Sequence, residues 1–412
     1  MNLVIKSIQA FSEYDSRGDL TISGTLVLSN GQTVEASIPN TLSKNKKAGV
    51  YLENSKALKF VNDLLAPKLV DTNPLEYKKI DRWLIQLDTS ERKEIFGVNT
   101  ILLISELIYR AGAVISNQPL PTYLNKIYNE NFEPTKLVKM PTPIFSMISG
   151  GKHGSVSLNF QEFSILFSTQ TSYEQALVKA TSLHHELAKV FEYRNIFSGV
   201  GNDGAYVPNL SSNYDALEII KEAILRSKLK IGADIFFALD VASTYFYKSG
   251  KYYLSEDVGS LDQKSLMEFY EKIFKEYRFL ILEDPFVEDD EKGWKMAMEK
   301  FGKKAYLLGD DLLSMNSKSL TKAVKSNLCS MANIKIFQRG TIWEVLEFIA
   351  AARKGKLKIV LSQSAIETND SFIADLAVGV QVDFVKFGAP VRGERVIKQN
   401  RMLAIERELF NG

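Results

Sequence analysis

The chain has 412 residues, of which 45% are hydrophobic and 24% charged, a balance typical of a soluble globular protein with more than one domain. A formal net charge of +2 argues against a nucleic-acid-binding protein, and no apolar run approaches the roughly 20 residues of a membrane span. The N-terminal residues show no signal-peptide pattern, and the single cysteine, Cys329, permits no intrachain disulfide, so we expect a cytoplasmic protein. Cys329 lies in an apolar stretch that is typical of a buried, inert thiol.

The N-terminal third combines strand and helix patterns. Residues 3–38 alternate between apolar and polar in three runs, and Asn30-Gly31 is a strong hairpin signal between the second and third. Apolar residues at helical spacing follow, and a sheet followed by helices predicts a small α+β domain over residues 1–135. The polar, proline-bearing segment 129–143 marks the predicted boundary with a second domain over residues 136–412.

Beyond that boundary, short apolar runs alternate with helical stretches. Such runs, bounded by turn signals, are typical of buried parallel strands, and they occur near 144–148, 163–168, 236–240, 279–283, 306–308, 332–335, 358–361 and 384–386. Clear helices are predicted over 172–194, 213–227, 341–353 and 393–409. The pattern predicts the α/β class and a (β/α)8 barrel. Because G-G-K-H-G-S-V-S rather than a helix separates the first two strands, we expect an irregular, hairpin-like first strand pair.

Charged residues end several of these runs. Asp240, Glu283 and Asp310 follow three strands, and Lys335 and Lys386 follow two later ones. Such positions are typical of catalytic residues in barrels. Three carboxylates suit Mg²⁺, and a crowded mouth near that ion should disfavour the ammonium form of a lysine, which could then act as a base. Alternatively, the acids could lie at surface helix starts, and the lysine stems could merely cover apolar surface.

Several longer motifs occur in a fixed order along nearly the whole chain. They are E-Y-D-S-R-G-D-L-T, I-S-G-G-K-H-G with F-Q-E-F, A-L-D-V-A-S-T-Y-F-Y-K-S-G-K-Y, L-E-D-P-F-V-E-D-D, G-D-D-L, I-K-I-F-Q-R-G-T, E-T-N-D-S-F-I-A-D-L and K-F-G-A-P-V-R-G-E-R. In this order they resemble the motifs of the enolase (phosphopyruvate hydratase) family. The resemblance implies an enolase-type barrel and a hydro-lyase that dehydrates 2-phosphoglycerate, a phosphorylated hydroxy acid, in glycolysis. It also implies a cytoplasmic homodimer or an assembly of dimers.

The resemblance assigns roles to residues that match the family motifs. The implied cofactor is Mg²⁺, two per active site, with Asp240, Glu283 and Asp310 as ligands of one ion and Ser43 as a ligand of the second. Lys335 matches the base that removes the proton next to the substrate carboxylate, and Lys386 matches the lysine that helps to stabilise the enolate-like intermediate. This proton is very weakly acidic, so fixed positive charge must neutralise the developing negative charge.

Three further residues match active-site positions, and one motif departs from the family. His153 and Gln161 are the implied substrate contacts, and Glu162 is implied to assist the acid. The family's G-D-E-G-G reads here as G-N-D-G-A, residues 201–205. Asp203 therefore replaces the glutamate that acts on the leaving hydroxyl, and its side chain is one methylene shorter. A displacement of about 1 Å can cost on the order of 100-fold in rate.

The largest departure lies after the seventh barrel strand, where the family's S-H-R-S-G-E-T reads S-Q-S-A-I-E-T. Gln363 and Ser364 remain predicted substrate contacts, but the arginine that would hold the phosphate is absent. A charged hydrogen bond contributes roughly 1.5–3 kcal/mol, so its loss could weaken binding about 10- to 100-fold. We therefore hypothesise that Arg339 or Lys44 restores positive charge. The loop after Pro39 also lacks the family's glycine hinge.

These departures leave two alternatives to an enolase. One is a diverged dehydratase that removes an α-proton from another carboxylate substrate without a phosphate. The other is a non-catalytic paralogue that serves as a binding partner. Retention of the three acids and both lysines counts against the paralogue. The same observations predict neither nucleic acid nor membrane as a partner.

Overall fold

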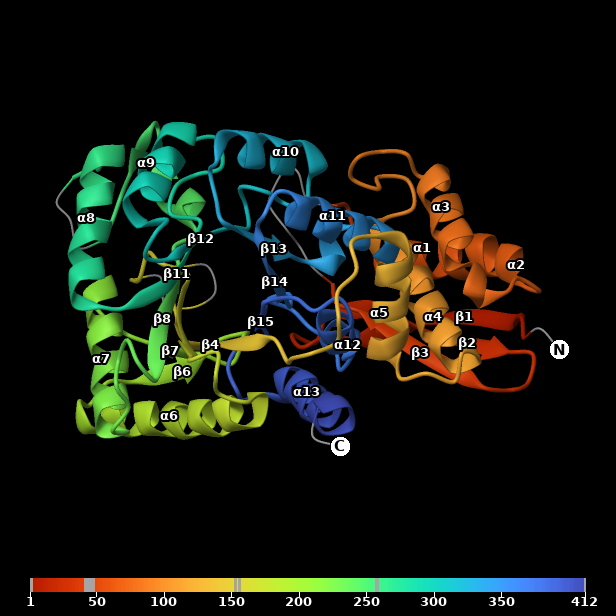
Figure 1. Cartoon of the computed structure of the whole chain (residues 1–412), viewed down its shortest axis with the longest axis horizontal. Helices are drawn as coiled ribbons and strands as arrows, with labels where there is room; N and C mark the ends of the chain where they lie inside the picture. Colours follow the sequence, from red (N-terminus) through yellow and green to blue (C-terminus); the bar gives the residue numbers. More distant parts are fainter. Residues whose placement is uncertain (1–2, 41–48, 152–153, 155–156, 256–258, 411–412) are drawn as a thin grey trace.

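The computed structural model of the chain describes residues 3–40, 49–151, 154, 157–255 and 259–410. Its N-terminal part is an antiparallel sheet in the order β1-β2-β3, with helices packed beside it (Figure 1). The predicted hairpin is present: Gly31 has φ of 88°, a conformation that favours glycine, between the second and third strands. The elements are β1 Ile5–Tyr14, β2 Leu20–Leu28, β3 Thr33–Ile38, α1 Asn54–Lys59, α2 Ala66–Leu69, α3 Tyr77–Leu87, α4 Val98–Ile115 and α5 Leu120–Asn131.

Helix α4 forms the apolar centre of this N-terminal part. It is the one helix among the described residues that is long and apolar enough to cross a membrane, and 83% of it is buried inside the molecule. A helix that is apolar all round is typical of a protein core as well as of a membrane span. The burial of α4 against the sheet places it in the core here.

The C-terminal part is a closed barrel of eight strands, as predicted. They are β4 Thr142–Ser149, β5 Glu162–Phe167, β8 Ile235–Asp240, β11 Phe279–Glu283, β12 Tyr306–Gly309, β13 Met331–Ile334, β14 Lys358–Ser362 and β15 Phe384–Lys386. Pairing between β15 and β4 closes the ring. Strand β5 runs antiparallel to both neighbours, which confirms the irregular first pair.

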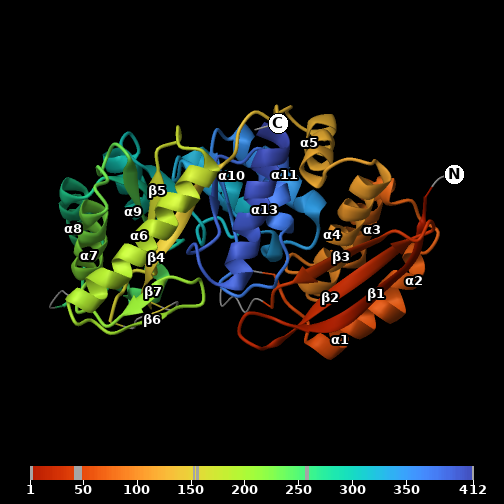
Figure 2. The same cartoon turned by 90° about the horizontal axis from the view of Figure 1, so that it is seen from below.

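Helices surround the barrel (Figures 1 and 2). Its interior is filled by side chains. The predicted helices are present with ends within one residue; the set is α6 Tyr173–Tyr193, α7 Asn213–Arg226, α8 Gln263–Glu276, α9 Glu291–Phe301, α10 Ser317–Ser326, α11 Ile342–Lys354, α12 Phe372–Gly379 and α13 Gly393–Phe410. One apolar residue from each barrel strand lies in the inner layer: Ile144, Leu166, Ala238, Ile281, Leu308, Met331, Val360 and Phe384. The barrel is therefore a packed core, and any site must lie at its mouth.

The reversal of β5 matters for that mouth. Because β5 is antiparallel, its first residue, Glu162, pairs with the last residue of β8, Asp240. Asp240 pairs in turn with Glu283, the last residue of β11. A short hairpin of β6 Ser198–Val200 and β7 Tyr206–Pro208 joins β4 through Ile148 and brings residues 201–205 to the same end.

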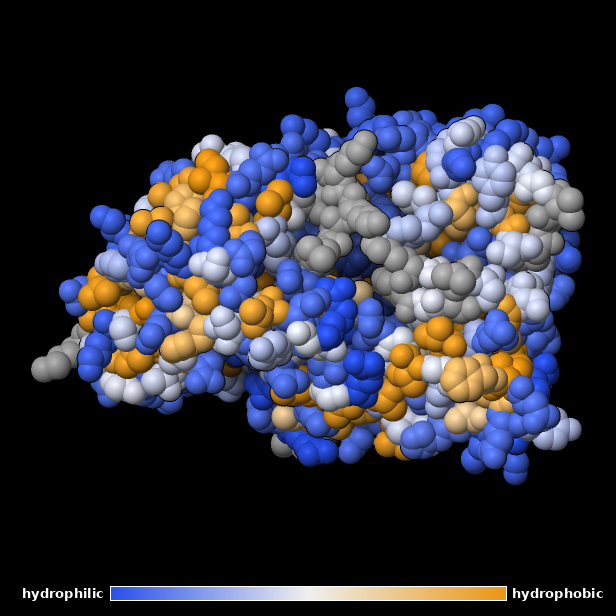
Figure 3. Space-filling model, turned by 180° about the vertical axis from the view of Figure 1, so that it is seen from behind, coloured by the Kyte–Doolittle hydropathy of each residue, from blue (hydrophilic) through white to orange (hydrophobic). Residues whose placement is uncertain are grey.

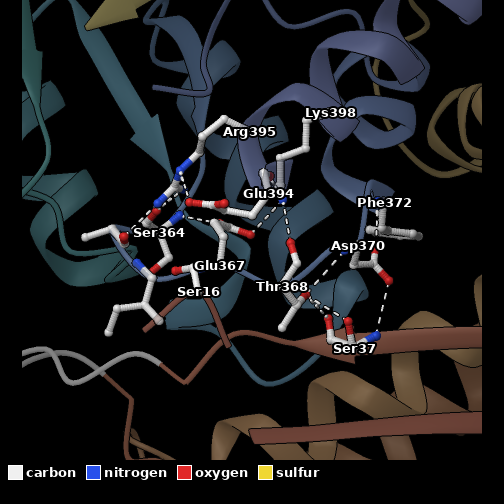
Figure 4. A network of polar contacts seen from close by, with 12 residues as sticks. Ser16, Ser37, Ser364, Glu367, Thr368, Asp370, Phe372, Glu394, Arg395 and Lys398 are labelled. Atoms are coloured by element: carbon white, nitrogen blue, oxygen red, sulfur yellow. Dashed lines mark hydrogen bonds and ion pairs between the residues drawn. The ribbon is translucent and has the colours of Figure 1, made fainter. Parts of the chain in front are cut away.

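The N-terminal sheet reaches the mouth through polar contacts with the loop after β14 (Figure 4). Ser37 donates from its Oγ to Thr368 Oγ1 at 2.8 Å and from its main-chain nitrogen to Asp370 at 3.1 Å.

The face of the molecule that lies behind the view of Figure 1 is mostly hydrophilic, with separate hydrophobic patches (Figure 3). The predicted division at residues 135 and 136 stays a prediction.

Candidate active site

A cavity of about 240 Å³ opens at the C-terminal ends of the barrel strands. Most of the predicted site residues line it: Gln161, Glu162, Asp203, Asp240, Asp310, Lys335, Gln363, Ser364 and Lys386. Glu283 lies just below and reaches the site through Lys386. His153 and Ser43 lie outside the described residues. Residues that are far apart in the sequence thus meet because they lie at or next to the ends of barrel strands, or in the β6–β7 turn, at the same mouth.

Lys386 is the charged centre of this site. Its buried Nζ lies 2.6 Å from Glu283, 3.3 Å from Asp240 and 3.5 Å from Glu162. Burial alone would lower the pKa of Lys386, but the surrounding carboxylates outweigh it and hold the pKa well above its usual value. Lys386 is therefore a fixed positive charge, which suits the stabilisation of a negative intermediate.

Lys335 follows β13 and contacts the carboxylate of Asp310 directly. Burial would lower the pKa of Lys335, but the Asp310 carboxylate raises it, and the net direction is upward. The expectation that a crowded mouth beside Mg²⁺ disfavours the ammonium form stays a prediction, while the direct ion pair with Asp310 keeps Lys335 charged in this structure. The reason is that an ion pair favours the charged form more strongly than desolvation opposes it.

The acids at the mouth repel one another. Burial raises the pKa of Asp240 to about 6. The positive charge of Lys386 lowers this pKa, and the negative charges of Glu162 and Asp310 raise it. Burial likewise raises the pKa of Glu283 well above its usual range, and the neighbouring Asp240 adds to the effect. Crowded carboxylates of this kind favour a bound cation.

Among the described residues, no three acidic, histidine or cysteine side chains are clustered closely enough to hold an ion as they stand. The ammonium groups of Lys335 and Lys386 lie against the carboxylates instead. The donor chemistry nevertheless fits Mg²⁺, because carboxylate oxygens are the hard ligands that this ion prefers.

Two residues that the sequence did not single out hold the acids in place. Asn333, inside β13, donates to Glu283 Oε1 at 3.1 Å and accepts from Ser362 Oγ at 2.7 Å. The buried Asp284 accepts from the main-chain nitrogens of Asp310 at 3.1 Å and Asp311 at 2.7 Å. The acidic L-E-D-P and G-D-D motifs contained the signal for Asp284, but its partner could not be inferred from spacing alone.

Asp203 is held rigidly in its turn. Its Oδ2 accepts a hydrogen bond from Ser149 Oγ at 2.6 Å, and its Oδ1 accepts from the main-chain nitrogen of Ala205 at 3.1 Å. Gly388, which follows β15 with φ of 77°, packs against it: a Cβ there would lie 2.5 Å from both Asp203 O and Gln363 Nε2. Glycine is therefore required where the two altered loops approach the barrel.

Two amide side chains leave buried oxygens available to a ligand. The Oε1 atoms of Gln161 and Gln363 are buried in this region and have no hydrogen-bond partner in the described protein. Buried polar atoms are normally satisfied, so these two indicate a site that a polar ligand completes. Gln161 also donates to Asp240 Oδ2 at 3.2 Å.

Arg395, at the start of α13, connects the two altered loops behind the cavity (Figure 4). Its fully buried guanidinium donates to the main-chain oxygens of Ser364 at 2.8 Å, Ala365 at 2.7 Å and Asn202 at 2.8 Å. The planar fork of arginine can satisfy three such acceptors at once. Sequence reasoning missed this role, because the three carbonyls come from segments about 160 residues apart.

Of the two cations that were expected to compensate for the missing arginine, Arg339 is the one that the structure describes. Arg339 is absent from the described residues that line the cavity, and its Nη2 donates to Ser317 Oγ at 3.3 Å instead. Lys44 lies outside the described residues. The geometry therefore does not support the Arg339 hypothesis.

Comparison with known proteins agrees with this arrangement. The family model described as "Enolase, N-terminal domain" matches residues 5–124, and that described as "Enolase, C-terminal TIM barrel domain" matches residues 137–412. An enolase of Ehrlichia ruminantium is 35% identical over 99% of this chain and 97% of its own length. An enolase of Ehrlichia chaffeensis is 33% identical over the same shares. The chain belongs to the enolase family and is a hydro-lyase.

Proposed function

We propose that the protein is a phosphopyruvate hydratase that dehydrates 2-phosphoglycerate to phosphoenolpyruvate with two Mg²⁺ ions. The observation that carries the proposal is the meeting of Asp240, Glu283, Asp310, Lys335 and Lys386 at one barrel mouth. This combination suits removal of a weakly acidic proton next to a carboxylate, because it supplies a base and positive charge together.

The metal would be held by Asp240, Glu283 and Asp310, whose crowding is relieved by a cation. When bound, Mg²⁺ supplies positive charge that stabilises the negative charge developing on the substrate carboxylate. Ser43, the proposed ligand of a second ion, lies outside the described residues.

The side chains of the chain then divide the proton chemistry. With a cation held by Asp310, the ion pair that keeps Lys335 charged would be replaced, and Lys335 in its neutral form then takes the proton from the carbon next to the substrate carboxylate and becomes an ammonium. Lys386 keeps its positive charge throughout and faces the resulting negative charge. Asp203, helped by Glu162, delivers a proton to the leaving hydroxyl, which departs as water. Hydrogen bonds from Ser149 and Ala205 fix the positions of both Asp203 oxygens for this step.

The cellular setting belongs to the same proposal. We place the enzyme in the cytoplasm, in glycolysis, as a homodimer or an assembly of dimers. Apolar side chains at and just after the end of α6 support an assembly, because Tyr193 and Phe197 are 76% and 85% exposed.

A second function is favoured by one observation. Ser364 and Ala365 replace the residues that hold the phosphate in the family, so a dehydratase acting on an unphosphorylated carboxylate is the alternative. Its proton-abstraction site would be the same, and only the distal contacts would differ.

The test is an absorbance assay for phosphoenolpyruvate with 2-phosphoglycerate and Mg²⁺. We expect turnover by the wild type and a loss of about 100- to 10,000-fold in Lys335→Met, because the base is gone. Lys358→Met is the matched control: this lysine is ion-paired with Asp383 at 2.8 Å but lies at the opposite end of the barrel. Its activity should be unchanged.

The outcomes separate the candidates. Mg²⁺-dependent exchange of an α-proton on unphosphorylated hydroxy acids, without turnover of 2-phosphoglycerate, would replace the first proposal by the second. No Mg²⁺ binding by calorimetry and no turnover would leave a non-catalytic binding partner. Equal activity of Lys335→Met and wild type would refute the assigned base.

A further inference from the structure

We propose that Arg17, in the N-terminal sheet region, binds the phosphate group of the substrate in place of the arginine that Ser364 replaces. This inference rests on the proposed function and names the residue that makes the site specific for a phosphorylated acid. The starting observation is that Arg17 lines the same cavity as Ser364, Ala365 and Ile366, although it comes from the other part of the chain.

The backbone around Arg17 is held firmly. The carboxylate of the buried Asp15 accepts from the main-chain nitrogens of Arg17 at 2.8 Å and Asp19 at 3.1 Å. The turn is closed by a hydrogen bond from Gly18 N to Asp15 O at 3.0 Å. A side chain that leaves such a fixed turn loses little additional conformational freedom of the backbone when it binds a ligand.

The turn is also attached to the altered loop. The main-chain nitrogen of Ser16 donates to Glu367 O at 2.8 Å, and Glu367 N donates back to Ser16 Oγ at 3.1 Å. Glu367 in turn accepts from Ser364 N at 2.7 Å. Figure 4 shows Ser16 and Ser364 close to Glu367. These contacts place Arg17 next to the loop from which the phosphate arginine is missing.

The distribution of charge in the cavity makes Arg17 the cation best placed to bind the phosphate. Within the described lining, the cationic residues are Arg17, Lys335 and Lys386. Both lysines lie against the carboxylates that would hold the metal. A phosphate needs a positive group outside that cluster, and a guanidinium can bind two phosphate oxygens at once.

The present partner of Arg17 does not prevent this. Its Nη2 lies 2.8 Å from Asp19, whose side chain is 57% exposed. Ion pairs between exposed side chains contribute little to stability, so Arg17 can exchange this carboxylate for a doubly charged phosphate at small cost. The side chain of Arg17 itself is 32% exposed, as expected at the rim of a cavity that a substrate covers.

The test compares Arg17→Gln with the wild type by steady-state kinetics and by calorimetric binding of 2-phosphoglycerate and of inorganic phosphate. We expect KM and both dissociation constants to rise about 10- to 100-fold, the effect of losing a charged hydrogen bond. The value of kcat should change much less, because the reacting carbon is held by the other half of the site. Arg339→Gln is the matched control and should change neither KM nor the two dissociation constants.

A second variant makes the result independent of folding. Arg17→Gln combined with Ser364→Arg should recover most of the lost affinity, since it returns the guanidinium to the family position. Unchanged binding in Arg17→Gln, or equal weakening in Arg339→Gln, would overturn the assignment. If the wild type fails to turn over 2-phosphoglycerate, the proposed function fails, while inorganic phosphate binding still decides the role of Arg17.

Discussion

The substitution Arg395→Lys tests whether the two altered loops are positioned from behind the cavity. Arginine donates to three buried carbonyl oxygens, at 2.7 to 2.8 Å, and a lysine ammonium at the end of a shorter stem can reach at most one of them. Two carbonyls are then left without partners, at about 1–3 kcal/mol each, so unfolding free energy should fall by about 2–6 kcal/mol. The loop that carries Asp203 should also shift, and a displacement of about 1 Å lowers kcat on the order of 100-fold.

Urea unfolding and the phosphoenolpyruvate absorbance assay measure these two effects separately. Arg353→Lys is the matched control, because Arg353 donates to the carbonyl oxygens of Val380 at 2.6 Å and Gln381 at 2.7 Å before β15, at the other end of the barrel. It should lose stability and keep its kcat. Equal kcat in Arg395→Lys and wild type would refute the positioning role, and unchanged stability would refute the hydrogen-bond reasoning.

Two further predictions concern groups outside the reaction. Burial lowers the pKa of His184 to about 4, and its ring stacks on Tyr206 with centroids 4.3 Å apart. The folded protein favours the neutral imidazole, and the resulting contribution to the free energy of unfolding is complete above about pH 6.5. It falls by about 3 kcal/mol by pH 4, because the unfolded chain takes up the proton first. Urea unfolding should show this loss in the wild type and not in His184→Gln; parallel pH profiles would contradict it. Burial raises the pKa of Cys329 to about 12, so the thiol should react with a disulfide reagent at pH 8 only as the chain unfolds, and rapid labelling of the folded protein would show that the thiol is accessible.

The alternation of strands and helices was readable because it depends on local spacing. Each barrel strand is a short apolar run, and the helices between them have apolar residues at helical spacing, so both kinds of element were predicted close to their observed ends. The G-G-K-H-G-S-V-S segment also indicated the hairpin-like first pair, since it offers no helical pattern. The direction of β5, which brings Glu162 to the same mouth as Asp240, followed from that pair.

The interactions among the side chains were not readable in the same way. The order of Asp240, Glu283, Asp310, Lys335 and Lys386 predicted that they share one mouth, but not that Lys335 would contact Asp310, whose carboxylate raises the pKa of the lysine. A pKa depends on distances of a few ångströms between groups on different strands, and these distances are set by packing.

The sequence by itself therefore determined the barrel, its first strand pair and the residues at its mouth, because strand and helix periods are local and strand ends meet at one edge. The tertiary structure alone decided which cations reach the cavity. The position of Arg339 after the sixth strand indicated a phosphate contact, yet this side chain contacts Ser317. Arg17 lines the cavity instead, although it lies some 350 residues before Ser364 in the sequence. Arg395 likewise joins two distant loops. Such contacts depend on how separate segments pack together, and no local pattern in the chain records that.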